Sequence, residues 1–233
     1  MPDVPFLCPM PDLPLPSELP FMDAPGLEAV GGFAHRLLLR HPSMAAEGER
    51  DEVIERLRPW HEAHIREMGF DASALALAEQ VHGADVAVVT PGASGIHPAV
   101  DGLVSCEPGV LLGIFVADCC AVYLVDPDAG AYGLVHSGKK GSEAGIVKRA
   151  LASMCELGAS RERIRVSLSP CIRPPAYEVD FASLIHRDCM DEGIRDIHFT
   201  DHGTCTSSDL RRFYSYRIEK GSTGRMLALL GRA

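Results

Sequence analysis

The sequence has no apolar run approaching the roughly 20 residues that a membrane-spanning helix needs. It also lacks the basic start and the uninterrupted apolar stretch of a secretory signal peptide. Basic residues are in the minority, because 22 Lys and Arg stand against 32 Asp and Glu and leave a net charge of -10. Proteins that bind nucleic acids or anionic membranes use Lys and Arg to neutralise phosphates. We therefore expect a cytoplasmic protein that binds neither nucleic acids nor membranes.

Two metal-binding patterns are also missing. None of the eight cysteines belongs to a Cys-X-X-Cys pair, and without a secretory signal we expect reduced thiols rather than disulfides. Any metal site must therefore combine cysteine with histidine or carboxylate from distant parts of the chain. The absence of paired His-X-His motifs argues against a multicopper oxidase of the usual kind.

What is present fits one folded domain, since 46% of the 233 residues are hydrophobic and no internal repeat or long linker divides them. Eight of the 17 prolines lie within the first 25 residues. Proline interrupts helices and central strands, so residues 1–26 are expected to form an extended arm laid over a domain of residues 27–233, or to be partly disordered. We expect a monomer or a weak homo-oligomer.

The most informative stretch runs from Gly113 to Gly141. Its expected strands are apolar, and polar residues that can carry chemistry stand at Asp118-Cys119-Cys120 and from His136 onward. Reactive side chains at the ends of buried strands are typical of active sites, because strands hold position while loops admit substrate. The expected strands are Leu111 to Val116, Ala121 to Val125 and Ala131 to Val135.

The sequence predicts two long helices. The first spans Glu47 to Met68 and should be kinked or split at Pro59. Its His61 and His64 are three apart, not four as in zinc proteases, and are interpreted as solvated helix histidines. The second spans Ser142 to Glu156 with Ser142 as its cap.

The loop before that second helix, Ser137 to Gly141, contains two lysines and two glycines. A helix N-terminus favours anions, so the loop is either a phosphate cradle or an ordinary solvated connection. His82, beside a glycine at a strand end, is similarly either a structural residue or a ligand. The Asp101-Gly102 pair indicates a turn. The remaining expected elements are strands at Ala74 to Gln80, Asp85 to Thr90, Arg163 to Leu168 and Leu227 to Leu230, a loop at Pro91 to Pro98 and a helix from Phe181 to Met190.

A series of short motifs then occurs in a fixed order: Gln80-Val81-His82-Gly83, Ala117-Asp118-Cys119, Val135-His136-Ser137-Gly138, Pro170-Cys171-Ile172, Cys205-Thr206, Ser215-Tyr216-Arg217 and Gly224-Arg225. Together they resemble the YfiH family, the laccase-domain or polyphenol oxidase proteins that are described as purine nucleoside phosphorylases. The resemblance implies an α+β, layered α/β fold, in which a single domain of mixed β-sheets carries helices on its outside.

The resemblance also implies a zinc site made by His82, Cys119 and His136, with copper as the alternative metal. Two imidazoles and a thiolate suit zinc, and three protein ligands leave a fourth position open for water or substrate. In an extended segment Cys120 would face away from Cys119, which favours Cys119 as the ligand.

The implied activities are phosphorolysis of adenosine, inosine, guanosine and methylthioadenosine, and deamination of adenosine, so the partners are purine nucleosides and phosphate. Asp118 joins the three ligands as a catalytic residue that could shuttle a proton while zinc-bound hydroxide attacks the purine. Candidates for binding substrate and phosphate are Gln80, Lys139, Lys140 and Arg217, with Arg225 more distant.

The chain departs from the family where the family reads HAGWRG. Here Lys139 and Lys140 replace tryptophan and arginine. Lysine keeps the charge but loses the bidentate fork, so phosphate affinity could fall or the substrate could differ. Near Gly31 the chain shows only a weak resemblance to the glycine-rich segment that lies near the N-terminus in the family.

Two alternatives use the same residues. One is a Cys-His hydrolase or a metal-dependent phenol oxidase. The other is a non-catalytic, zinc-containing nucleotide-binding protein, which a fourth protein ligand would favour. The candidates for that ligand are His97, His186, His198 and His202. Cys171 and Cys205 are interpreted as buried structural thiols.

Overall fold

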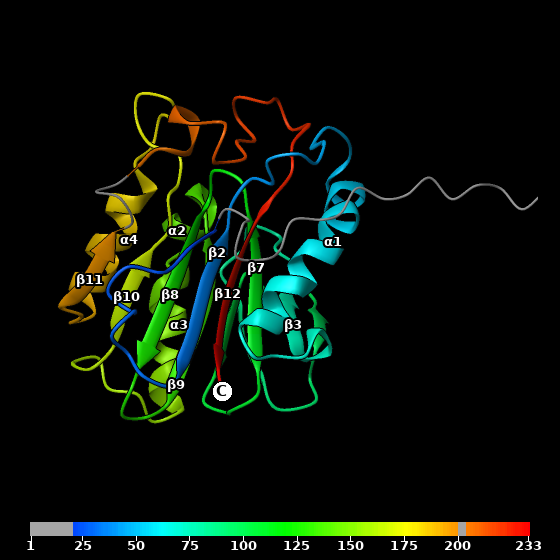
Figure 1. The fold of residues 1–233 in the computed structure, drawn as a ribbon. Coiled ribbons are helices and arrows are strands. Elements are labelled where there is room, and N and C mark those ends of the chain that lie inside the picture. The colour runs from blue at the N-terminus through cyan, green and yellow to red at the C-terminus, as the bar shows by residue number, and fades with distance from the viewer. Residues whose placement is uncertain (1–20, 200–203) are drawn as a thin grey trace, which may run out of the picture.

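The structure is a computed structural model that describes residues 21–199 and 204–233, and its core is a pair of six-stranded sheets (Figure 1). The first sheet contains, in spatial order, β1 (Phe21–Met22), β2 (Phe33–Leu38), β12 (Met226–Arg232), β7 (Leu111–Val116), β3 (Leu75–Ala78) and β5 (Gly95–His97). The second contains β11 (Asp196–Phe199), β10 (Arg165–Leu168), β8 (Cys120–Asp126), β9 (Ala131–Ser137), β6 (Gly102–Ser105) and β4 (Val86–Val88). Both sheets mix parallel and antiparallel pairs.

Helices cover the outer faces of the sheets. The helices are α1 (Arg50–Glu67), α2 (Lys139–Glu143), α3 (Ile146–Glu156) and α4 (Phe181–Asp191), with short 3-10 turns at Ala72–Ala74 and Thr206–Ser208. One apolar cluster joins α1 to the first sheet and to the inner face of the second, and another joins α3 and α4 to the outer face of the second (Figure 1). The expectation of one domain with mixed sheets and helices outside them is confirmed.

The three central strands β7, β8 and β9 lie where the sequence predicts them, with β8 and β9 extending one or two residues further. All residues of these strands are buried. Strands that are covered on both faces have continuous rather than alternating apolar sequences. The chain reverses between β7 and β8 at one end of the sheets, at the top in Figure 1, and that end carries the candidate site.

Helix α1 is not split at Pro59, since it continues through that residue. The interpretation of His61 and His64 as solvated is wrong, because they are only 5% and 0% exposed. Both rings lie beside the buried Trp60, at centroid distances of 5.4 and 5.7 Å. The histidines belong to the face of α1 that packs on the first sheet.

The prediction of one helix capped by Ser142 is also wrong. Gly145 adopts a left-handed conformation at φ +71° and separates α2 from α3. Ser142 lies inside α2, where its hydroxyl is 2.8 Å from that of Ser137. Lys139 and Lys140 are therefore the first two residues of a short helix and do not lie in a loop.

Two further segments differ in part from expectation. The region expected to be a loop from Pro91 to Pro98 contains β5, a three-residue edge strand that pairs in parallel with β3. Of the arm expected over residues 1–26, residues 1–20 lie outside the described part of the chain. In its remainder, β1 pairs with β2 and Ala24 is buried. No helix of the described chain combines the length and apolar character needed to cross a membrane.

Candidate metal centre and active site

A cavity of about 940 Å³ opens at the end of the sheets where β7 turns into β8. Its walls come from segments far apart in the sequence: the start of α1, the turn after β3, the β7–β8 turn, α2, the loop before α4 and the loop before β12. A volume of this size can enclose a ligand as large as a nucleoside.

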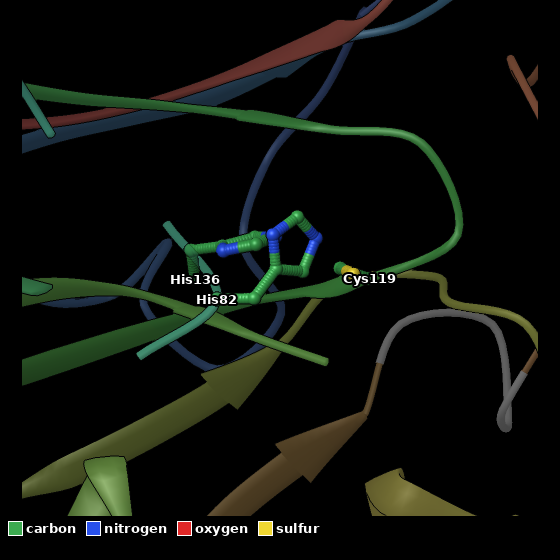
Figure 2. A group of neighbouring side chains, drawn as sticks. All are labelled: His82, Cys119 and His136. Carbon is green, nitrogen blue, oxygen red and sulfur yellow. The ribbon is translucent and has the colours of Figure 1, made fainter. Parts of the chain in front are cut away.

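Three side chains meet on the wall of this cavity. His82 comes from the turn after β3, Cys119 from the β7–β8 turn and His136 from the end of β9, and Figure 2 shows them together. One potential ligand atom from each lies within 4.8 Å of the others. His82 is exposed, Cys119 is half-buried and His136 is buried, so the cluster is reached from the side of His82. The structure thus assembles the three residues that the sequence motifs nominate.

Asp101 holds this cluster together, and sequence reasoning interpreted it only as part of a turn. Its buried carboxylate accepts a hydrogen bond from Nδ1 of His136 at 2.7 Å. It also accepts the backbone N–H groups of Val81, His82 and Gly83 at 3.1, 2.9 and 2.7 Å. A carboxylate that accepts from Nδ1 fixes the imidazole tautomer and leaves Nε2 as the metal donor. In the sequence, the one hint of this role is that Asp101 is an acidic residue that stands before a glycine.

Gln80 fixes the same turn from the other side. Its amide nitrogen donates to the Phe115 carbonyl at 2.6 Å, and its amide oxygen accepts the Phe115 N–H at 2.8 Å. Both Gln80 and His82 have positive φ values, 65° and 62°, so the turn is tightly bent. Gln80, expected to bind substrate, lines the cavity and at the same time joins the turn to β7.

Electrostatics favour an ionised thiol in this cluster. Burial opposes ionisation of Cys119, but the charge and hydrogen bonds of His136 and the nearby His82 prevail and lower the pKa of Cys119 to about 6. Burial also disfavours protonated His136, yet Cys119 and Asp101 raise the pKa of His136 to about 9. Thiolate is the metal-binding form of cysteine.

The donor set fits a metal ion. A tetrahedral zinc with nitrogen and sulfur ligands places its donors about 3.5 Å apart, which the observed cluster can reach with small side-chain movements. Two imidazoles and a thiolate also occur in copper sites, so the donor set is compatible with both metals. Cys120 does not join the cluster, because it is fully buried and its thiol points to the Ser169 carbonyl.

Histidines proposed for a fourth ligand position lie elsewhere. His97 bonds to the Ala93 carbonyl, His186 stacks near Phe199, and His198 pairs with Asp196. Within residues 21–199 and 204–233 none of the three joins the cluster, and His202 lies outside the described residues. Of the two cysteines expected to be buried, Cys171 is buried and Cys205 is only half-buried, with its sulfur near the Arg173 N–H and the Ser207 hydroxyl.

Asp118 lies beside Cys119 with a positive φ of 81°. Its carboxylate accepts hydrogen bonds from the Thr206 hydroxyl at 2.6 Å, the Ser215 hydroxyl at 3.1 Å and the Arg217 backbone N–H at 2.7 Å. These contacts attach the loop that precedes β12 to the wall of the metal site.

The cavity is rich in cations although the protein is acidic. Among the described residues, six basic side chains line it against three carboxylates. The basic residues are Arg50, Lys139, Lys140, Arg217, Lys220 and Arg225, and the acidic ones are Glu79, Asp118 and Glu178. Lys139, Lys140 and Arg217, expected from the sequence to bind phosphate, are among them, whereas Arg50 and Lys220 were not foreseen. Such a local positive field attracts anions.

Comparisons with known proteins identify relatives of this chain. The family model described as "Multi-copper polyphenol oxidoreductase laccase" matches residues 45–182 and 179–233. The purine nucleoside phosphorylase of Deinococcus radiodurans is 34% identical over 241 aligned residues, covering 91% of this chain and 93% of the relative. The purine nucleoside phosphorylase YlmD of Geobacillus stearothermophilus is 30% identical, over 79% of this chain and 80% of that protein.

Solved structures show the same architecture. The crystal structure of YlmD from Geobacillus stearothermophilus superposes with a TM-score of 0.76 at 27% identity, covering 87% of this chain and 93% of the other. The YfiH protein of Bacillus licheniformis shares the fold, with a TM-score of 0.77 at 21% identity over 88% and 95% of the two chains. On the family model, the ordered motifs and these relatives, the chain belongs to the laccase-domain family, the YfiH family of the polyphenol oxidase type.

Proposed function

We propose that the protein is a zinc-dependent purine nucleoside phosphorylase. The observation that carries the proposal is that one cavity holds both a His-Cys-His cluster, open on the side of His82, and an excess of cations. Two relatives that match most of the chain are named purine nucleoside phosphorylases. The proposed substrates are adenosine, inosine, guanosine and methylthioadenosine, each with phosphate.

Phosphorolysis makes two demands on such a cavity. A phosphate oxygen forms a bond to ribose C1′ while the C1′–N9 bond breaks and its electron pair leaves with the purine. The phosphate therefore needs cations and N–H donors, and the purine needs a site that holds its flat ring. Basic side chains meet the first demand, and Tyr177, Phe181 and Tyr216 on the cavity wall offer aromatic surface for the second.

Bound zinc would supply a Lewis acid at the edge of the cavity. His82, Cys119 and His136 would hold it, and Asp101 would keep the His136 ring in its donating orientation. We extend the proposal to hydrolytic deamination of adenosine, since three protein ligands leave a position at which a water could be held against the purine.

Replacement of the family's tryptophan and arginine by Lys139 and Lys140 bears on substrate choice. Lys139 lies 3.6 Å from Glu178, so part of its charge is neutralised within the protein. Lys140 has no carboxylate at ion-pair distance in the described part of the chain. A lysine presents a point charge and not a planar fork, so this wall offers an anion weaker and less directional contacts than an arginine would.

The proposal is tested by metal analysis together with chromatography of adenosine reactions with and without phosphate. Wild type should contain near-stoichiometric zinc. From adenosine it should release adenine only when phosphate is present, and by deamination it should form inosine and ammonia. Cys119→Ala should lose both zinc and turnover, whereas the matched control Cys120→Ala should keep both. Zinc-loaded wild type that turns over no nucleoside contradicts the proposal. Copper-dependent phenol oxidation, or alkylation of Cys119 that stops hydrolysis of a metal-free enzyme, would support the competing activities instead.

A further inference from the structure

The cations of the cavity differ in whether a carboxylate already neutralises them. Glu178 lies 3.6 Å from Nζ of Lys139 and 2.7 Å from Nη2 of Arg217, so both cations share one carboxylate partner. The Arg217 guanidinium also rests on the Tyr177 ring, 4.7 Å from its centroid. Each cation of this wall therefore already has a carboxylate at ion-pair distance, although Glu178 offsets only one of the two positive charges.

Arg225 differs in lacking a carboxylate partner, although its guanidinium also lies over a ring, 5.5 Å from the centroid of Tyr216. Within residues 21–199 and 204–233 no carboxylate lies at ion-pair distance from it, and its side chain is partly buried in the cavity wall. Its Nη1 donates to the Thr223 and Gly224 carbonyls at 2.8 and 2.9 Å, which fixes the direction of the guanidinium. In the described chain the Nε and Nη2 donors have no such partner. A charged guanidinium that is fixed in direction and still has free N–H donors is suited to bind an anion.

Arg50, the first residue of α1, lines the same cavity. In the described part of the chain its carboxylate partner is Asp51, which is 3.0 Å away but largely exposed, and such pairs contribute little. Burial lowers the pKa of Arg225 and the charge of Arg50 lowers it further, whereas Cys119 and Asp118 raise it. Arg225 thus lines the same cavity as a second arginine and the metal cluster. Two uncompensated arginines that repel one another are stabilised when an anion lies between them.

We propose that the phosphate co-substrate binds at Arg225, with Arg50 as a second cation of the same cavity, and not at the Lys139 side chain that pairs with Glu178. This rests on the proposed phosphorylase function and assigns the place of its second substrate. The bidentate fork of arginine matches a phosphate oxygen pair, and the position lies next to the metal ligands. It leaves the wall formed by Ile172, Tyr177 and Phe181 for the nucleoside.

The test is calorimetric titration of inorganic phosphate into the metal-loaded protein without nucleoside, with the metal content of each variant measured. Arg225→Gln should weaken phosphate binding by about tenfold or more, because a charged hydrogen-bond pair is lost. Arg225→Lys should keep part of the affinity. The matched control Lys139→Gln removes a cavity cation that is already paired with Glu178 and should change the affinity by less than about threefold.

Three results would overturn the assignment: a wild type that does not bind phosphate, an Arg225→Gln variant that binds it as the wild type does, or a larger loss in Lys139→Gln. A parallel titration with adenosine 5′-monophosphate separates the two sources of a phosphoryl group. If Arg225→Gln weakens only the nucleotide, the anion site serves a phosphorylated substrate and the co-substrate assignment fails. Because binding is measured without turnover, a wild type that binds phosphate through Arg225 but cleaves no nucleoside retains the anion site while the phosphorylase proposal fails.

Discussion

Asp101 Oδ1 lies 2.7 Å from Nδ1 of His136, and the same carboxylate accepts the N–H of the segment that carries His82. One buried side chain thereby orients two metal ligands that are 54 residues apart in the sequence (136 − 82). Asp101→Asn should reduce metal affinity by about 10- to 100-fold, because the amide turns a donor toward groups that are themselves donors. Competition with a chelator measures this affinity.

The matched control for that substitution is Asp196→Asn, since Asp196 also pairs with a histidine, His198, but away from the cavity. It should bind metal as the wild type does. An Asp101→Asn protein that is folded and has unchanged metal affinity would show that the carboxylate does not act on the metal ligands.

Gly138 is required by the close approach of Cys119. A Cβ at this position would lie 2.6 Å from the Cys119 sulfur, shorter than any ordinary contact. The backbone at Gly138, with φ -103° and ψ -167°, suits any residue, so space and not conformation is the constraint. Gly138→Ala should therefore displace the thiolate and lower the metal content of the purified protein well below one equivalent.

The control for this prediction is Gly31→Ala, because Gly31 has no heavy atom within 4 Å of a Cβ and does not have a positive φ. It should retain full metal content. A full equivalent of metal in Gly138→Ala would mean that Cys119 is not a ligand, or that the β7–β8 turn shifts enough to accommodate the added methyl group.

Ordered motifs made the metal ligands predictable, since His82, Cys119 and His136 each stand in a short segment whose type and order can be read along the chain. The function of Asp101 could not be read in this way. Its partners lie between 18 and 35 residues away, and an acidic residue before glycine looks the same in any turn. Hydrogen bonds between distant segments depend on the packing of the two sheets, which local patterns do not encode.

The same limit explains the other differences. The apolar spacing of α1 predicts a helix, but it does not reveal that the first sheet covers the face with His61 and His64. Apolar continuity predicts β7, β8 and β9, whereas β5 has three residues and too little pattern to distinguish it from a loop. Arg50 is more than 170 residues from Arg225, so only the fold brings them to one cavity.

The buried histidines of α1 should make the protein less stable in mild acid. Burial lowers the pKa of His61 to about 3, with His64 and His41 adding to the shift, and burial and Arg36 lower that of His64 to about 4. Unfolded histidine titrates near pH 6.5. Between pH 6.5 and 4 the unfolded chain therefore binds more protons, so stability is complete above this window and falls with decreasing pH by up to about 1.4 kcal/mol per unit for each histidine.

Urea unfolding at pH 7, 6 and 5 measures this slope. His61→Gln should show a shallower fall in the free energy of unfolding between pH 6.5 and 5 than the wild type. The control His186→Gln changes a half-buried histidine on α4 and should keep the wild-type slope. Equal slopes for His61→Gln and the wild type would show that His61 is not held neutral by the fold.

Asp118 distinguishes two roles that the motif alone cannot separate. Its position beside Cys119 suggests proton transfer, but its carboxylate already accepts the Thr206 and Ser215 hydroxyls and the Arg217 N–H. We expect an anchoring role. Asparagine tolerates the positive φ at this position, so Asp118→Asn should change the contacts without straining the turn.

The amide oxygen of Asp118→Asn can still accept one or two of these bonds, but its NH2 group cannot accept, so a hydroxyl that faces it must turn round to accept or lose its partner. We therefore expect a loss of about 1–3 kcal/mol in stability and a higher KM for the nucleoside, because the loop that bears Tyr216 and Arg217 loosens while the metal content is unchanged. A proton-transfer role predicts the reverse pattern: a large fall in kcat at constant KM with unchanged stability. Measuring both kinetic constants and the unfolding midpoint on the same variant decides between them, since a residue that only positions the loop cannot abolish kcat while leaving KM and stability intact.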